Sequence, residues 1–302
     1  MPLALHDISF DDLPLLQKYL PFYGNGDCNL SVAALLTRGP SRGTKVGEFH
    51  NHLLVRWRVE GFDAPVLQFP IGCCVGVDLI LELEAALREE GEPLRLYGSV
   101  PELLLWVQKL MPERSFVVTS ASSGWDYLYR RDAFASLEGR PMAKKRNFTR
   151  RYHAANPEAQ FVPISSETIP LLRDFLAEWY EAEGELTASL EEERTAIERA
   201  LDAREALHIE GGLLMSGSRV DGFTYGTLVS KDIVAVHIEK ARRDVTGAYP
   251  ALASAFARSL PEKVVFLNRE EDIGIPGLRK AKQAWFPCGM LQKGIVEITP
   301  AP

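Results

Sequence analysis

A cluster of polar side chains follows a short apolar run near the C-terminal end of the sequence. The run Val264–Leu267 has the composition of a buried strand, and residues 268–272 (NREED) follow it directly. Packing alone does not account for five adjacent polar side chains at such a place. Because an amide and carboxylates can move a proton or hold an ammonium group, we take Asn268, Glu270 and Asp272 as candidate catalytic residues.

A further carboxylate, Glu239, follows the preceding apolar run, Ile233–Ile238. Side chains alternate along a strand, so we expect Glu239 to share a face with His237. Glu239 is a candidate to accept a proton or to hold the α-ammonium of an aminoacyl group. The competing interpretation is a salt bridge to Arg279 or Lys280.

Cations are concentrated in the same part of the chain and in the segment 137–153, which has no acidic residue after Glu138. This basic segment is either a solvated helix face or a site for the phosphates of a nucleotide or RNA. Ion pairing within 268–282 competes with anion binding there. The candidate donor-binding cations are Lys144, Lys145, Arg146, Arg269, Arg279, Lys280 and Lys282.

The elements that must position these residues form a strand–helix–strand unit. A helix over 248–260 separates the two apolar runs, so the strands are predicted to be parallel and ligands to bind at their carboxyl ends. We expect the carboxylates and cations to gather there around one groove. The turn into the helix places Gly247 and Tyr249 where backbone N–H groups can hold a phosphate, unless Gly247 only makes the turn. Residues 244–249 read DVTGAY, and they lack the leading cation and final small residue of the usual acetyl-CoA loop.

The remaining pattern is mixed α/β. Helices are predicted over 168–183 and 189–203, the second opened by a capping box at Ser189, and an antiparallel meander follows. In the first half, helices and strands interleave. Pro157 and Pro163 mark a boundary, which predicts an N-terminal domain of residues 1–156 and a C-terminal domain of residues 157–302 that holds the site.

Composition excludes several classes of protein. The chain has 302 residues, 25% of them charged, and a net charge of -7, which argues against a dedicated nucleic-acid binder. No secretory leader and no apolar stretch of about 20 residues occurs, and the four cysteines form no CxxC pair, so we expect free thiols in a reducing cytoplasm. The Cys73-Cys74 pair is interpreted as part of the core. We expect no metal site, no tightly bound cofactor and no Ser-based nucleophilic triad.

Four stretches carry a resemblance to a known family: KKRN at 144–147, IEKA at 238–241, GAY at 247–249 and NREEDIGIPGLRKAK at 268–282. They resemble soluble relatives of the phosphatidylglycerol lysyltransferase C-terminal domain, a family also catalogued as DUF2156. The resemblance covers about residues 10–298. It implies two tandem GNAT-like acyltransferase domains, each a mixed, mostly antiparallel sheet flanked by helices. Lipid-modifying relatives transfer an aminoacyl group from aminoacyl-tRNA to a lipid head group.

The expected function is therefore that of an acyl- or aminoacyltransferase. The candidate donors are aminoacyl-tRNA and acyl-CoA, and the acceptor is an amine or hydroxyl on a small molecule, a peptide or a lipid head group. The alternative is a non-catalytic ligand-binding or regulatory protein on the same scaffold.

Overall fold

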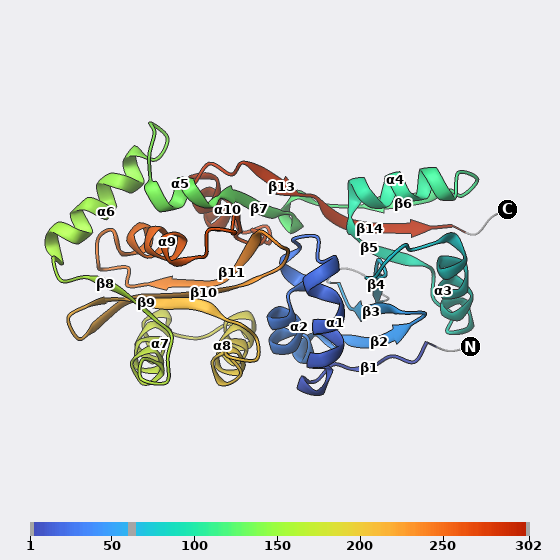
Figure 1. The fold of residues 1–302 in the computed structure, drawn as a ribbon, viewed down its shortest axis with the longest axis horizontal. Coiled ribbons are helices and arrows are strands. Elements are labelled where there is room, and N and C mark those ends of the chain that lie inside the picture. Colours follow the sequence, from blue (N-terminus) through green and yellow to red (C-terminus); the bar gives the residue numbers. More distant parts are fainter. Residues whose placement is uncertain (1–2, 60–64, 300–302) are drawn as a thin grey trace.

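The computed structural model describes residues 3–59 and 65–299, and its strands form two seven-stranded sheets (Figure 1). The first sheet has the order β1 (His6–Asp7), β2 (Lys45–Phe49), β3 (His52–Trp57), β4 (Val66–Gln68), β5 (Arg95–Ser99), β14 (Lys293–Ile298) and β6 (Phe116–Thr119). The second has the order β13 (Gly289–Leu291), β7 (Asp126–Arg130), β12 (Phe266–Asn268), β11 (Ile233–Ala241), β10 (Arg219–Leu228), β9 (Glu210–Ser216) and β8 (Gln160–Pro163). In each sheet one pair is parallel, β4–β5 and β11–β12, and the other pairs are antiparallel. The predicted mixed α/β class is confirmed.

Helices cover both faces of the second sheet (Figure 1). The helices are α1 (Leu13–Tyr23), α2 (Val32–Arg38), α3 (Val77–Glu89), α4 (Val100–Leu110), α5 (Arg131–Ser136), α6 (Ala143–Ala155), α7 (Ile169–Glu183), α8 (Ala188–Asp202), α9 (Ala248–Ser259) and α10 (Pro276–Gln283). Helices α7 and α8 pack on one face, and α9 packs on the other with α6 outside it. In the part of the chain that is described, no helix has both the length and the apolar character that crossing a membrane requires.

The two sheets exchange strands. β14 comes last in the chain but lies between β5 and β6 of the first sheet, and β7 from the first half lies between β12 and β13 of the second. The sheets therefore do not divide at residue 156. The two domains 1–156 and 157–302 stay a prediction, and each sheet needs a strand from the other segment.

The start of one helix differs from its prediction. The capping box at Ser189 is wrong, because the side chain of Thr187 accepts the hydrogen bond from the Leu190 N–H and begins α8 two residues earlier.

Strand β12 is held by an apolar cluster on the α9 side of the second sheet. Leu267 of β12 is buried there beside Phe256 of α9, and Phe134 stacks on Trp285 with ring centroids 4.2 Å apart. This packing fixes the carboxyl end of β12, from which residues 268–272 continue.

Candidate functional site

Strands β11 and β12 pair over a short stretch and then part. The parallel pairing joins Ile233 to Phe266 and ends with Ala235 opposite Asn268, whereas β11 continues to Ala241. Beyond Ala235, one edge of β11 therefore has no neighbouring strand among the described residues. The predicted parallel unit is confirmed, and the candidate residues follow the point where its strands separate.

A β-bulge at His237 changes which way the side chains of β11 point. The register pairs Tyr225 with Ile238 and then Gly226 with Val236, so His237 is the extra residue. The His237 ring lies near Tyr225 on the side of α7 and α8, whereas Glu239 contacts Arg269. The expectation that Glu239 and His237 share a strand face is wrong, because the bulge interrupts the alternation.

Glu239 forms an ion pair with Arg269, with 2.7 Å between the guanidinium nitrogen and the carboxylate oxygen. The Arg269 guanidinium lies over the rings of Phe134 and Trp285, at 5.5 and 5.6 Å from their centroids. Lys145 of α6 lies over Trp285 as well, at 4.5 Å. One aromatic ring thus connects the basic segment to this carboxylate. The partner of Glu239 is Arg269, and not Arg279 or Lys280.

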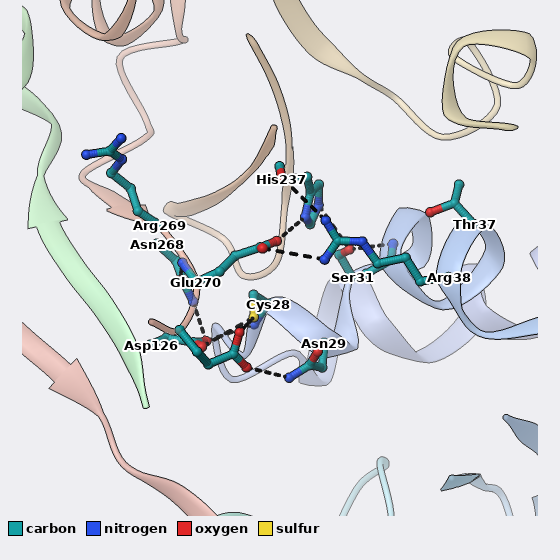
Figure 2. Close-up of polar contacts among 12 residues, drawn as sticks. Cys28, Asn29, Ser31, Thr37, Arg38, Asp126, His237, Asn268, Arg269 and Glu270 are labelled. Carbon is teal, nitrogen blue, oxygen red and sulfur yellow. Dashed lines mark hydrogen bonds and ion pairs between the residues drawn. The ribbon is translucent and has the colours of Figure 1, made fainter. Parts of the chain in front are cut away.

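Glu270 points to the opposite side and holds a buried histidine (Figure 2). His237 Nδ1 lies 2.8 Å from Glu270 Oε1, and Arg38 of α2 reaches Glu270 Oε2 at 3.4 Å. Burial opposes ionisation of Glu270, but Arg38 and the hydrogen bond from His237 outweigh it and lower its pKa to about 2. The carboxylate is therefore charged at neutral pH.

The other ring nitrogen of His237 faces hydroxyl groups. Nε2 lies 2.8 Å from Thr227 Oγ1 and 3.2 Å from Ser31 Oγ, so Ser31, His237 and Glu270 form a hydroxyl–imidazole–carboxylate series. Because Ser31 is 1% exposed and its oxygen accepts the Ala34 N–H at the start of α2, it caps a helix inside the protein. Sequence reasoning missed this series, since its members are far apart in the chain.

Asn268 belongs to a third set of contacts, which is fully buried. Its side-chain amide donates to the carbonyl of Gly26 and to Asp126 Oδ2, both at 2.7 Å, and its Oδ1 accepts the Glu270 N–H at 2.8 Å (Figure 2). The backbone N–H of Cys28 also donates to Asp126, at 3.0 Å. Asn268 thus orients the turn after β12, as an Asn side chain does when it bonds to the backbone two residues on.

A lysine from the first sheet lies in the same buried region as Asn268 and Asp126. Lys293, the first residue of β14, forms ion pairs with Asp27 at 3.1 Å, with Asp126 at 2.6 Å and with Glu271. Burial raises the pKa of Asp126 to about 7, although Lys293 opposes the shift. Asp27, Cys28 and Asp126 are close enough together to hold a metal ion, but the ammonium group of Lys293 already meets the carboxylates at this place.

Asp272 forms a separate pair with Arg279. Its carboxylate accepts from the Arg279 guanidinium at 2.8 and 3.0 Å, from the Tyr127 hydroxyl at 2.7 Å and from the Gly274 N–H at 2.9 Å. The hydrogen bond from the Arg279 guanidinium is the main reason that the pKa of Asp272 is lowered to about 2. Helix α10 begins after Ile275 without a side-chain cap, so Asp272 does not cap this helix.

The remaining predicted cations differ in their exposure to solvent, and so in whether they can bind an anion. Lys280 and Lys144 are exposed, whereas Lys282 is buried and donates to the backbone carbonyl groups of Arg269 and Glu271. Arg146 donates to the Leu137 carbonyl at 2.6 Å. Lys282 and Arg146 therefore stabilise the local backbone in this structure.

The turn at Gly247 is covered by α6. Gly247 has a φ of 87°, and a Cβ atom there would lie 2.2 Å from the carbonyl oxygen of Phe148. The Ala248 N–H donates to the Val245 carbonyl, and Pro250 has no N–H. Tyr249 is half-buried. Its N–H is the first in the helix that has no backbone acceptor among the described residues. Neither Ala248 nor Pro250 therefore offers a free N–H to a pyrophosphate.

The predicted site residues do not converge on a single groove. Glu239 meets Arg269, Asn268 meets Asp126, and Arg279 meets Asp272, each in a different place. Two shallow cavities of about 420 and 490 Å³ lie elsewhere, one beside His208 and one between α7 and α8. The residues that sequence reasoning missed come from the N-terminal third and from β7 and β14. They are Asp27, Cys28, Ser31, Arg38, Asp126 and Lys293.

The only local signals for these residues were weak. Ser31 precedes an apolar helical run, as an N-cap residue does, but this pattern predicts a helix and not a contact with His237. Asp126 and Lys293 each begin a strand, where a charged residue is usually exposed.

Two mixed sheets, each with a helix that connects its two parallel strands, define a tandem mixed α/β class of protein. The family model described as phosphatidylglycerol lysyltransferase, C-terminal, matches residues 21–290, so the chain belongs to this family. The resemblance noted in the sequence is confirmed.

Solved structures agree with this assignment. A conserved protein of unknown function from Bacteroides thetaiotaomicron is 27% identical, with a TM-score of 0.89 over 98% of this chain and 99% of that chain. The C-terminal domain (DUF2156) of a putative lysylphosphatidylglycerol synthetase from Agrobacterium fabrum is 14% identical, with a TM-score of 0.61 over 95% and 91%. L-PGS from Bacillus licheniformis gives the same values, and both show a similar fold. No curated protein sequence matches the chain.

Proposed function

We propose that this protein is an aminoacyltransferase, which moves an aminoacyl group from aminoacyl-tRNA to an amine or hydroxyl acceptor. The observation that carries the proposal is the basic surface of α6 beside the Glu239–Arg269 pair. Membership in a family named for a lysyltransferase, and structural likeness to lysylphosphatidylglycerol synthetases, support the same reaction class.

The α6 surface favours a polyanionic donor. Four exposed cations have no ion pair among residues 3–59 and 65–299, namely Arg140, Lys144, Arg150 and Arg151. Phosphates spaced along an RNA backbone suit such a surface, because each contact releases a condensed counterion. Acyl-CoA is the weaker candidate, since the backbone of α6 packs directly on the turn at Gly247, where its pyrophosphate would bind.

The Glu239–Arg269 pair is the proposed reacting end of the site. Lys145 and Arg269 contact the same indole ring of Trp285, so a donor bound on α6 would bring its acyl end close to Glu239. Glu239 would hold the α-ammonium of the aminoacyl group, and Arg269 would stabilise the negative charge that develops on the carbonyl oxygen. The proposed roles of Asn268, Glu270 and Asp272 are to hold the turn that presents Arg269.

Binding of tRNA tests the donor. We expect Lys144→Ala/Arg150→Ala/Arg151→Ala to weaken tRNA binding at least tenfold and to reduce the slope of log affinity against log salt by about 2 to 3. The measurement is fluorescence anisotropy with labelled tRNA at several salt concentrations. A matched control removes three exposed lysines outside α6, in Lys109→Ala/Lys231→Ala/Lys263→Ala. Equal loss in both triple variants would rule out a specific surface on α6.

The rate of aminoacyl transfer tests the proposed role of the Glu239–Arg269 pair. Glu239→Gln keeps a hydrogen bond to Arg269 but loses the charge, so we expect transfer from labelled aminoacyl-tRNA to fall about a hundredfold while tRNA affinity stays the same. Unchanged transfer in this variant would show that Glu239 has no catalytic role.

A ligand-binding protein without catalysis is the second candidate function. The observation that favours it is the internal use of the predicted catalytic groups, since Asn268, Glu270 and Asp272 each have a partner inside the protein. If the protein binds tRNA with the salt dependence above but releases no amino acid from any aminoacyl-tRNA, this second function is correct.

A further inference from the structure

Two adjacent cysteines lie on the surface between β4 and α3, far from the Glu239–Arg269 pair in the fold. Cys73 and Cys74 are both exposed, and their sulfur atoms are 3.0 Å apart. The prediction that this pair belongs to the core is wrong, because both side chains point out of the first sheet's apolar cluster. We propose that Cys73 and Cys74 form a dithiol site for one soft, thiophilic metal ion of the Cu(I) class.

The geometry favours an ion over a disulfide. The Cα atoms of adjacent residues are about 3.8 Å apart, whereas disulfides usually need about 4.4–6.8 Å, so a bond between these sulfurs would be strained. An ion with metal–sulfur bonds of about 2.3 Å accepts two sulfurs separated by as much as about 4.6 Å. The two thiols are 3.0 Å apart, so their side chains would turn away from each other toward this limit as the ion binds to both. Thiolates are also the ligands that select Cu(I).

The loop that carries the cysteines is held on both sides. The ring of His52 on β3 bonds to the Cys73 carbonyl at 3.0 Å, and the indole N–H of Trp106 on α4 donates to the Val75 carbonyl at 3.1 Å. Gly72 allows the close approach, because a Cβ atom there would lie 2.7 Å from the His52 ring. The two sulfurs are therefore positioned before an ion arrives.

The backbone at Cys74 is unusual for a side chain with a Cβ atom. Its φ is 57°, in the left-handed region that glycine adopts most easily. The turn itself does not require a thiol there. Backbone strain of this kind is often found where a side chain has a function, and here it holds the Cys74 sulfur beside that of Cys73.

The negative charge of two neighbouring thiolates favours a cation between them. Two thiolates 3.0 Å apart would repel each other. An ion that bonds to both sulfurs cancels the repulsion and displaces both thiol protons. The step is 2 RSH + M⁺ → [(RS)₂M]⁻ + 2 H⁺, in which nothing is oxidised or reduced. Binding should therefore strengthen as the pH rises.

The test is a competition for Cu(I) between the protein and a coloured Cu(I) chelator, without oxygen and with excess ascorbate. We expect the full chain to remove one equivalent of Cu(I), with higher affinity at pH 8 than at pH 6. Cys74→Gly keeps the left-handed turn and so should fold normally, and it should lose at least a hundredfold in affinity, as should Cys73→Ser.

The matched control is Cys288→Ser, which removes an exposed cysteine that is not part of a pair; Cys28 is buried. This variant should bind Cu(I) like the unchanged protein. Retention of full affinity by Cys74→Gly, an equal loss in Cys288→Ser, or failure of the full chain to take up Cu(I) would each overturn the proposal. None of these results bears on transfer from aminoacyl-tRNA, so the two proposals fail separately.

Discussion

Glu270 adopts a left-handed backbone conformation, with a φ of 58°, directly after the turn that Asn268 orients. Such a conformation costs an ordinary residue about 1–2 kcal/mol. The side chain offsets this cost, because its carboxylate binds both His237 and Arg38. At the scale of the single residue, Glu270 connects β12, the bulge of β11 and helix α2.

Acid should lower the stability of the folded protein, because it protonates Glu270. The pKa of Glu270 is about 2 in the folded protein, below the ordinary value of 4.5. Its stabilising effect is therefore complete above about pH 4.5 and is lost as the pH falls toward 2. We expect Glu270→Gln to lower the free energy of unfolding at pH 7 by about 3 kcal/mol and to flatten its decline between pH 4.5 and 2. Urea unfolding at a series of pH values measures both effects.

The control for this prediction is Glu262→Gln, which changes an exposed carboxylate and should shift the free energy by less than about 0.5 kcal/mol. If Glu270→Gln shows the same pH dependence as the unchanged protein, the ion pairs of Glu270 do not stabilise the fold.

At the scale of the element, α6 and α9 meet at one glycine. The backbone of Phe148 in α6 approaches Gly247 so closely that no Cβ atom fits between them. Tyr152 of α6 adds a hydrogen bond of 2.8 Å from its hydroxyl to the buried Asp221 of β10. These two contacts fix the basic helix against the second sheet, and so place its exposed cations.

Replacement of this glycine should loosen α6. We expect Gly247→Ala to lower stability by about 2 kcal/mol or more, because alanine disfavours the left-handed conformation and its methyl group would clash with the Phe148 carbonyl. Thermal unfolding measures the loss. Gly277→Ala is the matched control, since a Cβ atom there meets nothing within 4 Å, and its midpoint should stay the same or rise. Equal midpoints for the two variants would contradict the close packing of α6 on the turn.

At the scale of the whole molecule, the chain crosses twice between the sheets. It passes from β6 to β7, and it returns from β13 to β14. Lys293 lies at the return crossing, where it pairs with Asp27 and with Asp126 of β7. These carboxylates share the single ammonium group of Lys293, so removal of Lys293 would leave carboxylates without a cation in the interior.

Neither half of the chain should fold alone. A fragment of residues 1–156 lacks β14, so β6 loses its neighbour, and a fragment of residues 157–302 lacks β7 from between β12 and β13. We expect each fragment to unfold without a cooperative transition in urea, as followed by circular dichroism, while the intact chain unfolds cooperatively. Mixing the two fragments should restore part of the transition. A cooperative transition in fragment 1–156 alone would show that the first sheet does not need β14.

The structure confirms some of the sequence predictions that rest on local patterns, the strand–helix–strand unit and the family among them. The apolar runs 233–238 and 264–267 with the helix between them predict a parallel pair, and β11, α9 and β12 form it. The motif at 268–282 indicates the family, which the match over residues 21–290 confirms. Local patterns succeed here because strand alternation and helical periodicity depend on neighbouring residues alone.

The contacts of the candidate site, by contrast, could not be predicted from local patterns. Asn268, Glu270 and Asp272 form a single polar run in the sequence, yet their partners are Asp126, His237 and Arg279 in three separate places. The bulge at His237 reversed the face expected for Glu239, and no pattern in β11 marks that extra residue. Such pairings depend on which distant strands and helices pack together.

The amino-acid sequence by itself determined the order of helices and strands, the parallel unit and the family, because each is encoded over a few dozen consecutive residues. The tertiary structure alone decided that β7 and β14 exchange sheets, that Lys293 meets the carboxylates at the crossing, and that Cys73 and Cys74 face the surface. The physical reason is that a buried charge or a strand edge takes its partner from whatever part of the chain packs against it, at any distance along the sequence.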